Sequence, residues 1–358
     1  MTGKKVYDIL FIILASYFVL SYNNVNNYCW DLIGYLGVIY EYDNSDIEQV
    51  HSKTFNTLKT NTSSTVFNHM TSENDYKGRV YGDINFFEEE LSFYRTKPLY
   101  TATSYILYKL NVPVLTALRI IVLLSSLLLL IITYYWLSIY NSPLVAIVIS
   151  LLLGHTHIFA DLQTFRSPDA TSNMLIMLSL FFVNQKKKGW IIIITLCLAV
   201  LARIDNVILA ALVAYFFLMK QKRTLTKLLI ISLISPVGLL LVPYISGNSL
   251  SWFIRFKFLE SYTEYYFHVL HVLRNMRGIQ YLLYAIITVL LFVNTRFINK
   301  SVFYIIIFTM SIHLILFPSL QERLFVAYEF VIIILLTQLI NSVTTKKAST
   351  KYVDASKA

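Results

Sequence analysis

Charged residues that interrupt long apolar stretches are the residues of this sequence best placed to do chemistry. Arg203 and Asp205 break an apolar run between residues 190 and 219, and Glu322 and Arg323 stand at the start of a later run. An unpaired charge among apolar segments is costly, so each should have a partner or a water-filled cavity. Arg203 and Asp205 favour a functional interpretation, although a tight turn between two apolar helices would also accommodate them.

Three more charged residues lie near the ends of apolar stretches early in the chain. Asp31 follows the first apolar run, and a carboxylate at a membrane surface can act as a general base toward a hydroxyl group; the same residue could instead cap a helix. Arg95 and Lys97 flank the start of a short amphipathic stretch. Their charges suit the phosphate or diphosphate of a substrate, and would equally suit contact with lipid headgroups.

Arg166 and Asp169 belong to a polar turn between two apolar runs, where charged residues are ordinary. We include both as candidate substrate-binding residues because the turn is expected on the same side of a membrane as Asp31. His155 and His157 precede this turn, but a His-x-His pair points to opposite sides of a helix. With two well-separated cysteines, the sequence offers no metal-ligand set. No cofactor is identified, and a requirement for a divalent cation stays open.

The composition is that of an integral membrane protein. The 358 residues are 56% hydrophobic and only 14% charged, whereas soluble domains carry about 25% charged residues. Several runs approach the length of about 20 apolar residues that a helix needs to cross a bilayer. The alternation expected of a membrane barrel is absent. These features predict an all-α, polytopic protein of about ten transmembrane helices, forming a single integral membrane domain over residues 1–358.

The basic residues predict how the chain crosses the membrane, because short cytoplasmic loops are enriched in lysine and arginine. Placing every basic cluster inside leaves an even number of spans between clusters, with both termini cytoplasmic and a cytoplasmic tail at 342–358. The outer loops are then 23–113 and 247–279. Of the 20 acidic residues, all but Asp8 and Asp354 then fall on the outer side. We therefore expect the active face to be outward, at the inner (plasma) membrane of a bacterium. The net charge of +10 is explained by this topology rather than by nucleic-acid binding.

The first outer loop, 23–113, is expected to contain two interfacial helices around a polar segment. Residues 31–41 form an apolar stretch that is too short to span, with Trp30 and several tyrosines suited to the interface. A second short amphipathic stretch covers 98–110, and Pro98 is a favourable first helical residue. Between them, residues 43–92 are rich in Asn, Thr, Ser and Glu without periodicity. This arrangement favours an enzyme that acts on a lipid-anchored substrate.

The order of these features resembles the GT-C superfamily of membrane glycosyltransferases, in particular the branch of the lipid A aminoarabinose transferases and protein O-mannosyltransferases. In that branch an acidic residue follows the first span with a tyrosine four positions on, as Asp31 and Tyr35 do here. A Lys-Pro-Pro-Leu element begins the second juxtamembrane helix, and Lys97-Pro98-Leu99 is similar with one proline missing. The resemblance covers residues 1–140 by motif. It implies that Asp31 acts as base or binds the acceptor, and that Lys97 contacts the carrier phosphate.

The expected function is transfer of a sugar from a polyprenyl-phosphate donor to a glycan, lipid or protein acceptor at the outer membrane face. Arg203, with Lys97 or Arg323, would stabilise the departing phosphate. Two alternatives stay open: a polymerase of O-antigen or capsule polysaccharide, and a lipid or polysaccharide transporter or flippase. Membrane lipids are expected partners and nucleic acid is not. A single site requires Asp31, Lys97, Arg203 and Arg323 to lie within roughly 20–24 Å of one another.

Overall fold

The computed structural model describes residues 3–22, 28–219, 285–290, 299–316 and 322–355, with single positions between 267 and 282. Its regular structure in these parts is helical throughout, which confirms the all-α prediction for them. The span expected at 226–246 and most of the outer loop expected at 247–279 lie outside the described residues.

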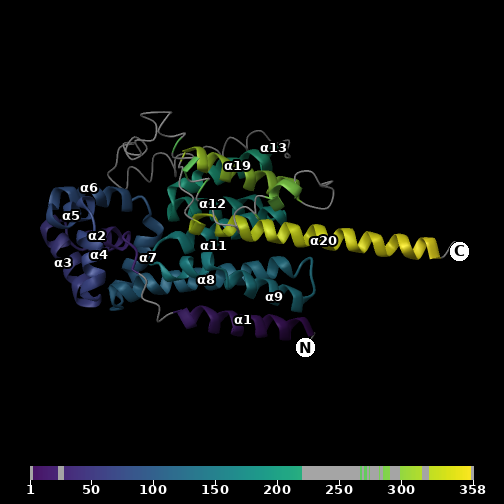
Figure 1. The fold of residues 1–358 in the computed structure, drawn as a ribbon, viewed down its shortest axis with the longest axis horizontal. Helices are drawn as coiled ribbons and strands as arrows, with labels where there is room; N and C mark the ends of the chain where they lie inside the picture. Colours follow the sequence, from purple (N-terminus) through teal and green to yellow (C-terminus); the bar gives the residue numbers. More distant parts are fainter. Residues whose placement is uncertain are drawn as a thin grey trace.

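The polar part of the first segment expected outside the membrane folds into short helices at one end of the molecule (Figure 1). They are α3 (Ile47–Asn61), α4 (Ser64–Ser72), α5 (Asp75–Gly82) and α6 (Ile84–Tyr94). Each begins at a residue whose side chain accepts a hydrogen bond from the first turn of its helix, namely Asp46, Ser63, Asn74 and Asp83. Such N-caps supply partners for amide groups that a helix start leaves unpaired. Capping therefore defines helices here where no hydrophobic periodicity does.

Helix α2 (Leu32–Glu41) is the core of the unit that it forms with α3 to α6, which we call the outer unit after its predicted side of the membrane. It matches the helix expected at 31–41. Every residue from Leu32 to Tyr40 is buried, in contact with α3, α6 and α7. Two glycines allow α6 to approach closely: a Cβ at Gly34 would overlap the Tyr94 ring, and one at Gly37 would overlap Leu91. Burial within the protein thus accounts for the apolar sequence of α2.

Helix α7 (Pro98–Lys109) follows, with Pro98 at its start as predicted. The remaining helices form a bundle around α8, which contacts α1, α9, α11 and α20 (Figure 1). The bundle consists of α1 (Gly3–Ser21), α8 (Val114–Leu137), α9 (Pro143–Gly154), α10 (His157–Thr164), α11 (Asp169–Asn184), α12 (Gly189–Ala202), η2 (Ile204–Asn206), α13 (Val207–Met219), α19 (Lys300–Leu316), η6 (Glu322–Leu324) and α20 (Val326–Ala355).

Polar contacts mark the two ends of this bundle. At one end, the Asn341 amide donates to the Tyr140 carbonyl over 2.8 Å, and Asn299 donates to Asn184 over 2.9 Å. At the other end, the Arg119 guanidinium donates to the Tyr22 carbonyl and to carbonyls at the end of α10. Arg119 therefore caps the C-terminal ends of two helices, an arrangement that suits a cation.

Two of the described helices are long and apolar enough to cross a membrane, α8 and the Val326–Thr344 part of α20. The pair α9 and α10 would be a third if it forms one broken span, bent by 67°. Helix α10 occupies much of the stretch where the sequence predicted only a polar turn, because Thr156 caps a new helix just after Gly154. The predicted break at Arg203 is confirmed, since α12 ends at Ala202. Ten spans stay a prediction.

Candidate functional site

Asp31 lies at the junction between the outer unit and the bundle. It precedes α2, but its side chain makes no capping hydrogen bond to that helix. Its carboxylate instead accepts from Arg323 Nη2 at 3.0 Å and from the Tyr94 hydroxyl at 3.4 Å. With 27% of its side chain exposed, Asp31 remains reachable from outside the protein. The Asp31 side chain therefore points toward Arg323 and Tyr94 and does not cap α2.

Asp169, the first residue of α11, joins two arginines from distant parts of the chain. Arg323 Nε lies 3.1 Å from one of its carboxylate oxygens, and Arg203 Nη1 pairs with the other. The Ser167 hydroxyl donates to the same carboxylate over 2.9 Å. Only 1% of the Asp169 side chain is exposed, so this residue holds the two guanidinium groups from within the protein.

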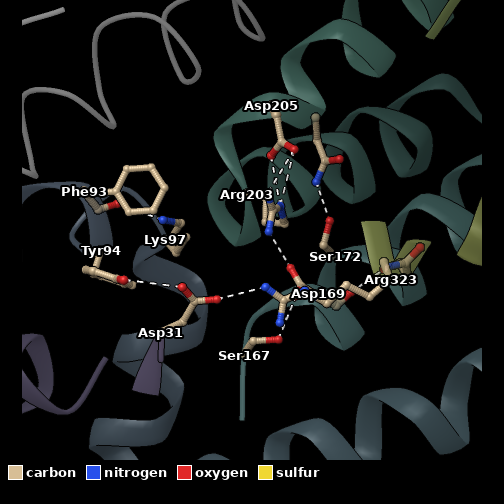
Figure 2. Close-up of polar contacts among 12 residues, drawn as sticks. Asp31, Phe93, Tyr94, Lys97, Ser167, Asp169, Ser172, Arg203, Asp205 and Arg323 are labelled. Carbon is tan, nitrogen blue, oxygen red and sulfur yellow. Dashed lines mark hydrogen bonds and ion pairs between the residues drawn. The ribbon is translucent and has the colours of Figure 1, made fainter. Parts of the chain in front are cut away.

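Arg203 continues the line of charges to Asp205 and His313. Arg203 Nε lies 3.1 Å from Asp205 Oδ1, and His313 Nε2 lies 3.1 Å from Asp205 Oδ2. Burial acts to raise the pKa of Asp205, but Arg203 and His313 hold it well below its ordinary value. We call the six residues Asp31, Arg323, Asp169, Arg203, Asp205 and His313 the charge network, and Figure 2 shows the first five of them.

Two buried asparagines fix the helices that carry the network. The Asn173 amide on α11 donates to the Arg323 carbonyl over 2.8 Å and accepts from the Ala327 amide at 2.8 Å. Asn206 in η2 donates to the Ser172 hydroxyl over 2.8 Å. These bonds attach the segments that carry Arg323 and Asp205 to α11. The arginines are consequently positioned by main-chain attachments as well as by their ion pairs.

Lys97 is a buried cation close to the network. Its Nζ donates to the Phe93 carbonyl over 2.8 Å and lies 3.4 Å from the centre of the Phe93 ring (Figure 2). Among the described residues no carboxylate forms an ion pair with it. Burial, with the nearby Arg203 charge, lowers the pKa of Lys97 to about 7. This amine can thus gain or lose a proton near neutral pH.

Tyrosines of α2, α6 and α7 support Asp31. Tyr35 packs edge-on against Tyr94 at 5.1 Å and against Tyr100 at 5.2 Å between ring centres. Tyr35 therefore orients the ring whose hydroxyl reaches Asp31. Burial and the Asp31 charge raise the pKa of the neighbouring Cys29 thiol to about 12, which disfavours its thiolate form.

The structure brings most of the predicted site residues together, and separates three of them. Arg95 Nε donates to Glu41 over 2.9 Å at the far end of α2. The Arg166 guanidinium lies 4.6 Å from the centre of the Tyr28 ring. Glu322 begins η6 beside Arg323 and is half-buried, outside the charge network.

Polar residues that were not predicted also belong to the site, among them His313, Asn173 and Tyr94. His313 sits in an apolar helix, and a lone histidine there gives no signal that it meets Asp205. Asn173 is likewise one amide in an apolar run, although a buried amide does need partners. Tyr94 is one of 26 tyrosines and is not distinguished by its neighbours. In each case the function of the residue depends on a partner that is distant in sequence.

The arrangement combines an accessible carboxylate with three cationic groups. Asp31 can accept a proton. Once it is protonated, the three cations Arg203, Arg323 and Lys97 exceed the two remaining carboxylates, Asp169 and Asp205, by one charge, which suits an anion such as a phosphate. Within the described residues, no three His, Cys, Asp or Glu side chains are grouped so as to hold a metal ion. The exposed Asp31 carboxylate beside Arg203, Arg323 and Lys97 suits acid–base chemistry next to a bound anion.

Comparison of this chain with family models, with curated proteins and with solved structures found no match.

Proposed function

We propose that the chain is a membrane glycosyltransferase that moves a sugar from a polyprenyl-phosphate donor to an acceptor hydroxyl at the outer membrane face. The acceptor oxygen attacks the anomeric carbon, and the bond from that carbon to the phosphate oxygen breaks. Its electron pair leaves with the polyprenyl phosphate. The acceptor proton passes to Asp31, so charge and atoms balance.

One observation carries this proposal: Asp31, Arg323 and Arg203, from three distant segments, belong to one network that Lys97 adjoins. A departing phosphate gains negative charge in the transition state, and fixed cations aimed at it lower the barrier. Asp31 is the most exposed carboxylate of the network, since Asp205 exposes 14% of its side chain and Asp169 only 1%. Asp31 is thus the carboxylate that an acceptor hydroxyl could reach.

The test is the substitution Asp31→Asn, which keeps the shape of the side chain and removes the base. A positioned general base contributes about 10²–10⁴-fold to a rate, so the envelope glycan of cells carrying only this variant should lose the transferred sugar. Membrane levels of the protein should not change. The matched control is Asp161→Asn, because Asp161 pairs with His157 outside the network. A normal glycan in the Asp31→Asn strain would refute the assignment of Asp31 as base.

A further inference from the structure

The outer unit carries a groove that lies away from the charge network. It is a groove of about 810 Å³ along α3, within the range of roughly 300–1,000 Å³ typical of small-molecule sites. Tyr40, near the end of α2, forms part of its wall. Asp31 precedes the other end of this ten-residue helix. At about 1.5 Å per residue, α2 separates the groove from Asp31 by about 15 Å.

The groove is lined mainly by uncharged groups that both donate and accept hydrogen bonds. These are the amides and hydroxyls of Asn44, Gln49, Ser52, Asn56, Thr57 and Thr60. Five of the six recur along one face of α3. A solvated helix face ordinarily carries glutamate and lysine, which are better helix formers than serine, threonine and asparagine. The composition of this face therefore calls for a reason other than helix stability.

Tyr40 of α2 is the aromatic residue that lines the groove. The Tyr40 hydroxyl bonds to Thr57 at 2.8 Å, and Lys53 Nζ lies 4.4 Å from the centre of the Tyr40 ring. The same Nζ donates to the Tyr108 hydroxyl over 3.0 Å. These contacts hold α3 on α2 and α7, the two helices that begin directly after Asp31 and Lys97. The groove and the charge network consequently share one scaffold.

We propose that this groove binds the acceptor as an oligosaccharide, whose chain extends along α2 to place a terminal hydroxyl at Asp31. Sugar hydroxyls donate and accept hydrogen bonds, as do the amides and hydroxyls of the groove. Lys53 is the one cationic residue that lines the groove, and Asp46 and Glu48 are two acidic ones. The lining thus has a net negative charge, which does not suit a phosphate. The inference rests on the proposed function, to which it adds the class of acceptor.

Binding can be measured separately from transfer on the full chain in lipid nanodiscs. The probe is a size-fractionated mixture of oligosaccharides released by mild acid from the surface polysaccharide of the source cells, observed by saturation-transfer NMR. Ser52→Trp fills the groove from an exposed position, and Lys59→Trp adds the same side chain to an exposed position of α3 outside the groove. Thermal unfolding of both variants checks that they fold.

Wild type and Lys59→Trp should bind the oligosaccharide, while Ser52→Trp should weaken binding by about tenfold or more. In a transfer assay Ser52→Trp should raise the KM for the acceptor and keep kcat. Absence of binding by wild type, or equal binding by Ser52→Trp, would overturn the groove assignment. Oligosaccharide binding without any donor cleavage would support the groove and refute glycosyl transfer instead.

Discussion

Lys97 is the site residue whose charge depends most directly on pH. Burial lowers its pKa to about 7, so the amine is only partly protonated in neutral solution. An anion binds the protonated form, and the protonated fraction falls about tenfold for each pH unit above the pKa. If a donor phosphate is held beside Lys97, donor binding should weaken as pH rises through 7.

This dependence gives the first prediction at the residue scale. For the wild type, kcat/KM for the donor should fall above about pH 7, because that parameter reports the ionisation of the free enzyme. Lys97→Arg should move the fall to much higher pH, since arginine stays charged. Lys97→Met should lower kcat/KM and remove the dependence. An identical pH profile for all three proteins would show that Lys97 does not contact the donor.

The sequence predicted several site residues and could not predict how they pair. Arg203 and Asp205 stand out because charge is costly in an apolar run, and Asp31 because of its place after the first run. The residues with which they pair are distant in sequence and give no local signal. Asp31, for example, forms an ion pair with Arg323, which lies near the other end of the chain. Arg95 shows the reverse case, because its spacing groups it with Lys97 whereas the structure pairs it with Glu41. The closeness of Arg95 and Lys97 in sequence did not show that their side chains point to different partners.

At the scale of elements, α11 is the helix on which the site is assembled. It presents Asp169 at its start, and one turn later Asn173 holds the η6–α20 junction through two hydrogen bonds of 2.8 Å. Only 1% of Asn173 is exposed. Loss of its amide would leave buried main-chain groups unpaired and would free the segment that carries Arg323.

We therefore predict that Asn173→Leu lowers both stability and donor affinity. Each buried polar group left without a partner costs about 1–3 kcal/mol, so thermal unfolding in nanodiscs should occur several degrees lower. The KM for the donor should rise because Arg323 loses its fixed position. Ser179→Ala is the matched control, as this buried α11 hydroxyl bonds only within its own helix. Unchanged donor KM in Asn173→Leu would show that Asn173 does not position Arg323.

Some elements were predictable from local signals and others were not. Pro98 marked the start of α7, and the charges at 203 and 205 marked the end of α12. Helices α3 to α6 were not separable in advance, because polar segments without periodicity show only their caps. The bend between α9 and α10 depends on the capping of α10 by Thr156 next to Gly154. The positions of helix ends and bends thus depend on a few residues next to each helix end.

At the scale of the whole molecule, the helices of the bundle run between two distinct ends. The end with Asn184, Asn299 and Asn341 lies at the lysine-rich turn 186–188. The charge network lies at the opposite end, because Asp169 and Asn184 are the first and last residues of α11. The outer unit lies at one end of the molecule as well (Figure 1), and it adjoins the network through Asp31. The inference of sidedness from lysine positions is compatible with this arrangement, and the orientation in the membrane stays a prediction.

Labelling of single cysteines tests that orientation. In a chain without Cys29 and Cys197, Ser64→Cys on the outer unit should react with a membrane-impermeant maleimide in intact cells. Lys187→Cys should react only after the membrane is permeabilised. Both positions are exposed in the structure, so accessibility within the protein is not limiting. Labelling of both sites in intact cells, or of Lys187→Cys alone, would contradict the proposed topology.

Glycosyl transfer itself is tested most directly with the purified wild-type chain in nanodiscs, supplied with polyprenyl-phosphate sugars from the source cells and with oligosaccharide acceptors. Mass spectrometry follows both products. The account predicts that free polyprenyl phosphate and extended acceptor appear in equal amounts, and that Asp31→Asn forms neither above background. Donor that stays intact in the presence of correctly folded wild-type protein would contradict it.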